Sequence, residues 1–253
     1  MTPSGPWLEQ RTEEFKASLA FSTRLPLAHL QSAKGIANAA WAFPVVGLIV
    51  GLIGALVYLL AHRLGLPAWP AATLSVVATL LVTGALHEDG LADTADGFGG
   101  GDSREKKLDI MRDSRTGVYG VCALVLALLL RIGTLASFTD AHGVVWALIA
   151  SHSAARAAMV MLMWLLPPAR SDGLSFAAGG PPGQGVAAAA AIAVIVLLFC
   201  LHPVRAAMAA LVLIATVALM AWLAMRQIDG QTGDVLGATE QVGEIAVLLV
   251  AVA

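Results

Sequence analysis

Charged residues are scarce in this chain, and that scarcity excludes an ordinary soluble domain. Only 13% of its 253 residues are charged and 58% are apolar, whereas soluble domains average about 25% charged and 45–50% apolar residues. A soluble domain of this length has too much surface to hide so many apolar side chains. Residues 43–61, 66–86 and 206–225 contain no charge at all, and apolar runs of about 18 or more residues are typical of membrane-spanning helices.

Cysteine is nearly absent, and the first 30 residues do not have the pattern expected of an export signal. Cys122 and Cys200 lie far apart in apolar runs, so we expect small buried hydrophobic side chains rather than a disulfide or a metal site. Residues 7–30 carry six charges and no uninterrupted apolar core, which argues against a cleavable signal peptide.

The apolar segments predict an all-α, polytopic helical bundle of about six to seven transmembrane helices. In lipid, each spanning segment must satisfy its own backbone hydrogen bonds, so the spans are expected to be helices. We expect one membrane domain over residues 1–253, with no linker or repeat. The predicted helices cover residues 42–62, 69–86, 118–138, 143–166, 185–201 and 205–226. The final apolar stretch completes a seventh span only if its helix begins near Thr239.

Basic residues predict which ends of the helices face the cytoplasm. An N-terminal arm over residues 1–40 carries four of them, and the loop over 87–117 carries five. The positive-inside rule places both in the cytoplasm. Counting spans onward places a third polar segment, residues 227–240, on the same face. The basic residues are Arg11, Lys16, Arg24 and Lys34 in the arm, and Arg104, Lys106, Lys107, Arg112 and Arg115 in the loop.

The first polar motif, residues 87–97, contains three aspartates. If the second helix continues through it, Asp89, Asp93 and Asp96 share one helical stripe. Like charges at this spacing repel, so the arrangement favours a bound divalent cation. Mg²⁺ prefers oxygen ligands and completes its shell with water and substrate phosphates. The alternative is a solvated acidic loop that caps a transmembrane helix.

Two further polar motifs complete the candidate site. Residues 109–117 interleave Arg112 and Arg115 with Asp113, and the planar guanidinium of arginine suits phosphate oxygens. Membrane anchoring by basic residues is the alternative interpretation. Residues 230–237 contain three glycines together with Gln231 and Asp234, and such a loop can offer backbone N–H groups to an anion. A plain turn between two helices would look similar.

A few residues inside the predicted spans also stand out. Arg131 and Arg156 are costly in hydrocarbon and are expected to face a partner or a cavity. We predict a site-supporting role for Arg156 and a packing role for His152, one turn away. Gly47 and Gly51 form a G-x-x-x-G pattern, which predicts close packing against another helix.

Together these motifs resemble the cobalamin synthase family, the adenosylcobinamide-GDP ribazoletransferases. Residues 87–97 are similar to its H-x-D-G-L-A-D-T-x-D-G motif, and residues 110–117 and 230–238 to its second and third motifs. Residues 21–26 and 43–44 also resemble the family. The similarity covers nearly the whole chain in one order and spacing, and it is weakest over residues 141–203.

The resemblance implies a magnesium-dependent transferase of the cytoplasmic membrane, with its active-site loops facing the cytoplasm. The 3′-hydroxyl of α-ribazole, or of its 5′-phosphate, would attack the cobinamide-bound phosphorus of adenosylcobinamide-GDP and release GMP. The expected partners are these substrates and the lipid bilayer, without nucleic acid. The expected metal ligands are Asp89, Asp93 and Asp96, and Asp93 or Asp113 would accept the hydroxyl proton. The expected substrate-binding residues are Arg24, Arg112, Arg115, Arg156, Gln231 and Asp234.

Two other functions fit part of the pattern. A lipid-type phosphoalcohol transferase would share the metal chemistry, and the layout is similar to that of the CDP-alcohol phosphotransferases. Their D-x-x-D-G-x-x-A-R pattern is not reproduced, because Asp93 follows Ala92 where arginine would stand. A cation transporter would place its carboxylates near the middle of the membrane, whereas here they gather at one edge.

Overall fold

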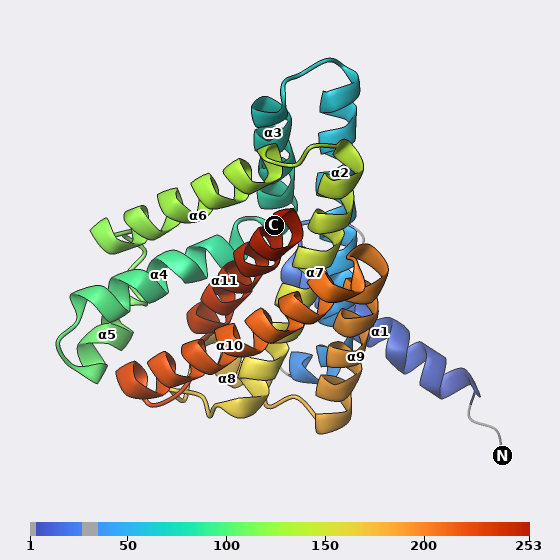
Figure 1. The fold of residues 1–253 in the computed structure, drawn as a ribbon. Helices are drawn as coiled ribbons and strands as arrows, with labels where there is room; N and C mark the ends of the chain where they lie inside the picture. The colour runs from blue at the N-terminus through green and yellow to red at the C-terminus, as the bar shows by residue number, and fades with distance from the viewer. Residues whose placement is uncertain (1–3, 27–34) are drawn as a thin grey trace.

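The chain is helical over almost its whole described length. The computed structural model describes residues 4–26 and 35–253, so Lys34 lies outside the described residues. Figure 1 shows the helices along the chain. Their bounds are α1 Ser4–Ser22, η1 Ile36–Ala42, α2 Phe43–Arg63, α3 Ala68–Thr83, α4 Leu86–Gly100, α5 Arg104–Ile110, α6 Val118–Ala136, α7 Ala141–Leu165, α8 Gly173–Ala178, α9 Gly183–Cys200, α10 Pro203–Ile228 and α11 Gly233–Val252.

The prediction of an all-helical, multi-pass membrane protein is confirmed. Within the described residues, six helices are long and apolar enough to cross a membrane, and a seventh span results if α3 and α4 count as one. Helix α11 begins at Gly233 rather than near Thr239. The last apolar stretch therefore belongs to a helix of spanning length.

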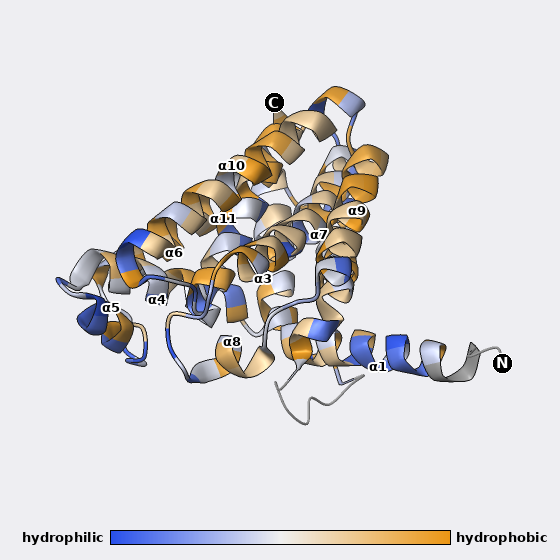
Figure 2. Cartoon of the chain, turned by 90° about the horizontal axis from the view of Figure 1, so that it is seen from below, coloured by the Kyte–Doolittle hydropathy of each residue, from blue (hydrophilic) through white to orange (hydrophobic). Residues whose placement is uncertain are grey.

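Large apolar side chains cover the outside of the bundle. Figure 2 shows hydrophobic residues along α6, α9 and α10, with the hydrophilic ones concentrated in α1, α5 and the loops. Leu81 and Phe199 are 72% and 78% exposed, as expected of side chains that face lipid. The burial predicted for the cysteines is wrong for Cys122, which is exposed, while Cys200 is half-buried. A small apolar side chain gains nothing by turning inward when its surroundings are hydrocarbon.

The second predicted helix does not continue into the aspartate motif. Helix α3 ends at Thr83, and α4 begins at Leu86 at an angle of 89° to it. Gly84 and Ala85 both adopt left-handed backbone conformations, with φ of 65° and 56°. Glycine does so without strain, whereas alanine pays a steric cost. Because of the bend, α4 runs nearly perpendicular to α3, and the aspartate motif does not lie on a continuation of α3.

Helix α7 forms the centre of the bundle, and α2 packs closely against it (Figure 1). A Cβ atom at Gly47 would collide with the His152 carbonyl, and one at Gly51 would lie 2.5 Å from the Leu148 carbonyl oxygen. The predicted role of this glycine pair in close helix packing is confirmed.

The polar loops gather at one end of the molecule. At the opposite end, residues 137–143, 200–205 and 251–252 line a common cleft. At the motif end, Arg104 of α5 donates to the Ile228 carbonyl oxygen, at 3.0 Å, and to that of Ala169. The loop after α7 and the turn before α11 are therefore tied to the helix that follows the aspartate motif.

Candidate active site

Two glycines allow α4 and the start of α11 to approach each other closely. A Cβ atom at Gly90 would lie 2.8 Å from the Asp234 carbonyl oxygen, and one at Gly237 would lie 3.3 Å from the His87 Cα atom. At Gly90 a side chain would collide with this backbone, and at Gly237 it would make an unusually tight contact. As a result, the first and third polar motifs, more than 130 residues apart in sequence, meet at one place.

This contact gathers three carboxylates and one arginine. Asp89, Asp234 and Arg170 line the same pocket, and the Asp93 carboxyl lies in the negative field of Asp89, Asp234 and Asp96, with Arg170 as the opposing charge. Arg170 Nη2 is 3.6 Å from Asp234 Oδ2. Its Nη1 atom is buried without a hydrogen-bond partner among the described residues. Negative charge therefore predominates here.

Asp96 differs from the other two aspartates of the motif, because both of its carboxylate oxygens accept hydrogen bonds from the start of α6. Its Oδ2 atom accepts a hydrogen bond from the Gly117 N–H at 2.6 Å, and its Oδ1 atom accepts one from the Gly120 N–H at 2.9 Å. These N–H groups belong to the start of α6, which lacks intrahelical partners for them. Asp96 thus caps α6 and holds it against α4.

The second motif lies beside the site and is exposed. Arg112 donates from Nη2 to both carboxylate oxygens of Asp172, at 2.8 and 2.7 Å. Arg115 donates to Asp113 over 2.5 to 3.2 Å. Hydrogen bonds from Arg115 lower the pKa of Asp113 to about 2. Both guanidiniums are therefore engaged with neighbouring carboxylates at the surface.

Gln231, in the third motif, bonds to α8 and to the loop that follows α7. Its Oε1 atom accepts a hydrogen bond from the Ser175 hydroxyl at 2.6 Å. Its backbone N–H donates to the Pro167 carbonyl at 2.9 Å, and its carbonyl accepts from the Ala169 N–H at 2.8 Å. The side chain is buried and does not belong to the wall of the pocket that contains Asp89 and Asp234. Its contacts hold the loop that carries Arg170.

Arg24 lies at the bend between α3 and α4. Its N–H donates to the Val82 carbonyl at 2.7 Å, which satisfies one of the carbonyls left open at the end of α3. A Cβ atom at Gly84 would lie 2.5 Å from the Arg24 Nε atom. The structure thus places Arg24 against the bend rather than in the pocket wall.

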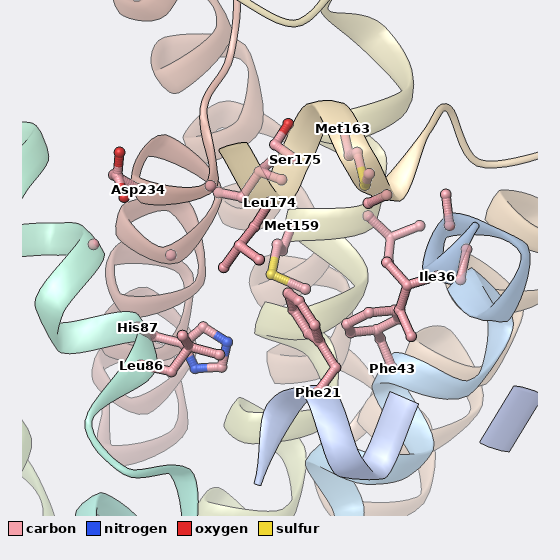
Figure 3. Close-up of a pocket in the computed structure, with 18 of the residues that line it drawn as sticks. Phe21, Ile36, Phe43, Leu86, His87, Met159, Met163, Leu174, Ser175 and Asp234 are labelled. Atoms are coloured by element: carbon pink, nitrogen blue, oxygen red, sulfur yellow. The ribbon is translucent and has the colours of Figure 1, made fainter. Parts of the chain in front are cut away.

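A pocket opens next to the carboxylates, with a volume of about 160 Å³. Figure 3 shows that α1, η1, α2, α4, α7, α8 and α11 contribute to it. Arg170 and Asp234 lie at the polar side, and the remainder is mostly apolar. Its further lining includes Phe21, Ile36, Phe43, Leu86, His87, Met159, Met163, Leu174 and Ser175.

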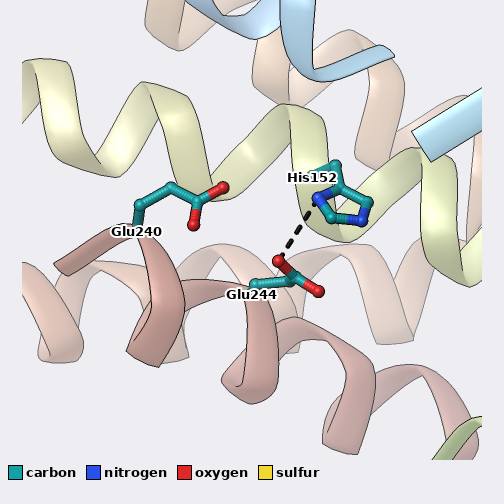
Figure 4. Close-up of side chains that lie close together, drawn as sticks. All are labelled: His152, Glu240 and Glu244. Atoms are coloured by element: carbon teal, nitrogen blue, oxygen red, sulfur yellow. Dashed lines mark ion pairs between the residues drawn. The ribbon is translucent and has the colours of Figure 1, made fainter. Parts of the chain in front are cut away.

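A buried network of ionic side chains lies behind the pocket. Arg131 is 2.7 Å from Glu88 and 2.8 Å from Glu244, and Arg156 is 2.7 Å from Glu240. This network joins α4, α6, α7 and α11 across the bundle. The expectation that the arginines within spans face partners is confirmed. Among the described residues, the network also holds the one group of three metal-type ligands close together, His152, Glu240 and Glu244 (Figure 4).

The network accounts for Arg156 and His152 without a direct role at the substrate. Arg156 is 1% exposed and does not line the pocket, so the structure does not bring it to the other predicted substrate-binding residues. His152 Nδ1 lies 3.2 Å from Glu244, as Figure 4 shows. The nearby arginines already oppose the glutamates, and the space among these side chains does not admit a water molecule. We therefore do not assign a metal site there.

Sequence reasoning missed Arg170, Asp172 and the pocket. Arg170 and Asp172 follow Pro167 and Pro168 at the end of α7, in the region where the family resemblance is weakest. A pair of opposite charges at the end of a span was a usable signal, because the span count places that end on the same face as the motifs. The pocket itself had no signal, since its walls come from seven separate elements.

Comparison with known proteins identifies the family of this chain. Residues 14–252 match the model of the cobalamin-5-phosphate synthase family. An adenosylcobinamide-GDP ribazoletransferase of Bradyrhizobium diazoefficiens is 51% identical over 100% of this chain and 98% of its own length. Proteins of the same name from Mesorhizobium japonicum and Azorhizobium caulinodans are 52% and 45% identical, covering 96% and 92% of this chain and 93% and 92% of their own. No solved structure matches significantly. The chain belongs to the cobalamin-5-phosphate synthase family.

Proposed function

We propose that this protein joins adenosylcobinamide-GDP to α-ribazole or its 5′-phosphate. The 3′-hydroxyl oxygen of the ribazole forms a bond to the cobinamide-bound phosphorus. The phosphoanhydride bond to the second phosphate breaks, GMP leaves, and the hydroxyl proton passes to a base. Family membership and relatives of that name, 45–52% identical along nearly the whole chain, support this activity. They favour it over a lipid-type phosphoalcohol transferase or a cation transporter.

The observation that carries the chemistry is the grouping of Asp89, Asp93 and Asp234 beside Arg170. Asp234 lies 3.6 Å from Arg170, Asp89 lines the same pocket, and Asp93 lies in the electrostatic field of both carboxylates, so the residues fit a divalent cation. Their oxygens are not all within 4.8 Å of one another, which is compatible with Mg²⁺ because it commonly binds one or two carboxylates and keeps several waters. Asp89 and Asp234, which line the pocket, would hold it, and Asp93 beside them would stay free to accept a proton. When bound, such an ion neutralises charge on a diphosphate and stabilises the leaving phosphate.

Arginines at the same end supply the complementary charge. Arg170 lines the pocket and has a buried nitrogen without a hydrogen-bond partner, which suits a phosphate oxygen. Arg112 and Arg115 are exposed beside it and, within the described part of the chain, are bonded to surface carboxylates, from which an incoming diphosphate can recruit them. We assign Asp96, Arg24, Arg156 and Gln231 a positioning role, because their contacts hold the helices and loops that carry the site.

The base that accepts the hydroxyl proton is better sought at Asp93 than at Asp113. Arg115 lowers the pKa of Asp113 to about 2, which makes that carboxylate a weak base. Efficient general bases have a pKa nearer the working pH. Asp93 lies with Asp89 and Asp234 at the site itself.

We infer that the site faces the cytoplasm from the cytoplasmic membrane. The basic residues of α1 and of the segment around α5 lie on the same side of the spans as the carboxylates. The positive-inside rule assigns that side to the cytoplasm. Nucleotide-activated substrates are made there, so both substrates would reach the site without crossing the bilayer.

Release of GMP is the direct test. Detergent-solubilised protein is mixed with Mg²⁺, adenosylcobinamide-GDP and either α-ribazole or its 5′-phosphate. We expect GMP and the joined product in equal amounts. The Asp89→Asn variant should release GMP about 100-fold more slowly or worse, which is the usual effect of removing one electrostatic contact to the transition state. The variant should still insert into the membrane and purify normally.

The exposed Asp102 offers a matched control, because it is an acidic residue just beyond α4. Asp102→Asn should retain the wild-type rate. Retained turnover in Asp89→Asn, with metal supplied, would remove Asp89 from the site. Absence of GMP from the wild-type protein with both acceptors would refute the proposed activity.

A further inference from the structure

Most of the pocket beside the carboxylates is apolar and shaped by aromatic and thioether side chains. Phe21 and Phe43 meet edge to face, with ring centroids 6.1 Å apart. Met159 and Met163 approach from α7, as Figure 3 shows. Methionine and phenylalanine make favourable contacts with flat aromatic rings. This part of the pocket therefore suits a planar apolar group.

The pocket changes character at one side. Asp89, Asp234 and Arg170 lie there. In Figure 3, Asp234 stands apart from the phenylalanines of α1 and α2, with Leu174 and Met159 between them. A ligand with an apolar ring at one end and hydroxyl groups at the other would satisfy both regions at once.

Size and polarity distinguish among the parts of the two substrates. The pocket volume is about 160 Å³, close to the ~150 Å³ cavity that holds a benzene molecule. The corrin macrocycle is far larger. The guanine base carries several hydrogen-bonding groups on its edges, and burying them against apolar walls leaves them unpaired at a cost of about 1–3 kcal/mol each. The dimethylbenzimidazole base of α-ribazole is small, flat and nearly without polar edges.

We propose that this pocket binds the base of α-ribazole. The dimethylated ring packs between the phenylalanines and the methionines, and the ribose points toward Asp89 and Asp234. The attacking hydroxyl thereby arrives at the carboxylate site, while the corrinoid stays outside. This assignment rests on the proposed function, because it takes α-ribazole as the acceptor.

Filling the pocket tests the assignment. Ala37 lines it from η1 and is buried, so Ala37→Leu places three extra carbon atoms in the space for the ring. We expect the KM for α-ribazole to rise at least tenfold, with the KM for adenosylcobinamide-GDP within twofold of wild type. Asn38→Leu is the matched control, since Asn38 is exposed on the same short helix, and both its KM values should be unchanged.

Changing the ligand gives a second test that needs no variant. α-Ribosides of benzimidazole and of adenine are compared with α-ribazole by equilibrium dialysis against the wild-type protein, with Mg²⁺, with and without adenosylcobinamide-GDP. Each buried methyl group contributes about 0.8 kcal/mol, roughly fourfold in affinity. The unmethylated riboside lacks two of these groups, so we expect it to bind about 15-fold more weakly, and the adenine riboside more weakly still.

Each outcome decides the question. A rise in the KM for adenosylcobinamide-GDP alone, unchanged constants in a folded Ala37→Leu protein, or equal affinity for all three ribosides would overturn the assignment. So would the absence of α-ribazole binding under every condition. Should the riboside series follow the expected order in a protein that releases no GMP, the pocket assignment stands and the proposed reaction fails.

Discussion

Replacing Arg131 with methionine is expected to destabilise the protein more than any change on its surface. Its guanidinium lies 2.7 Å from Glu88 and 2.8 Å from Glu244. It also donates to Thr79 at 3.2 Å and to Gln241 at 3.3 Å. Methionine keeps much of the side-chain volume but leaves two carboxylates without this partner in a dry interior.

The size of the effect follows from these contacts. Removing one partner of a buried ion pair costs about 3–5 kcal/mol, and Arg131 has two such partners, so we expect the upper part of that range. One kcal/mol shifts Tm by roughly 2–4 °C in proteins of this size. Arg131→Met should therefore lower Tm by about 10 °C or more. The double variant with Glu244→Leu should recover part of the loss, because one unpaired carboxylate is removed with its partner.

Thermal unfolding in detergent, followed through tryptophan fluorescence, measures these shifts. Arg226→Met is the control, because Arg226 is exposed and its guanidinium lies 5.4 Å from the Trp222 ring centroid. An exposed contact of this kind contributes about 0.5–1 kcal/mol. The reasoning is refuted if Arg131→Met melts with the wild-type protein, or if adding Glu244→Leu lowers Tm further by the full amount of the single change.

Three further outcomes are expected. Gly51→Leu should abolish accumulation of folded protein in the membrane, measured by blot, because the new Cβ would lie 2.5 Å from a carbonyl oxygen of α7. Gly133 has open space around it, so Gly133→Leu is the control and should accumulate normally. Asp96→Ala should lower the free energy of unfolding by about 1–2 kcal/mol through loss of the α6 cap. We expect a lower Tm, whereas the Mg²⁺ dependence of GMP release should be unchanged. Hydrogen bonds from Arg112 lower the pKa of Asp172 below its ordinary value of 3.8. The Tm difference between wild type and Asp172→Asn should therefore stay constant from pH 8 to 5 and shrink only below about pH 4. A difference that vanishes by pH 6 would contradict this pairing.

Much of the architecture could be predicted because lipid restricts the choices. The uncharged runs gave the spans within a few residues, since backbone groups in hydrocarbon must bond within their own helix. The bend after Thr83 escaped prediction. It depends on left-handed backbone at both Gly84 and Ala85, and alanine in that conformation has no sequence signal.

The candidate site was predicted only in part. Spacing along an ideal helix predicted that Asp89, Asp93 and Asp96 act together. Spacing within one helix does not reveal that Asp96 caps the start of a neighbouring helix. Asp96 binds the start of α6 instead. Asp234 joins the aspartates because Gly90 and Gly237 allow two distant segments to touch. Arg170 could not be found from spacing, because tertiary packing alone brings its loop to the pocket.

The buried ionic network also constrains how the chain is made. Arg131 and Arg156 belong to α6 and α7, whereas Glu240 and Glu244 belong to α11, which the ribosome synthesises after them. Inserting an arginine at the centre of a span costs about 2.5–3.5 kcal/mol on the translocon scale. Until α11 enters the bilayer, both arginines lack these counter-charges. Insertion of α11 thus completes charge neutralisation for helices that entered the membrane before it.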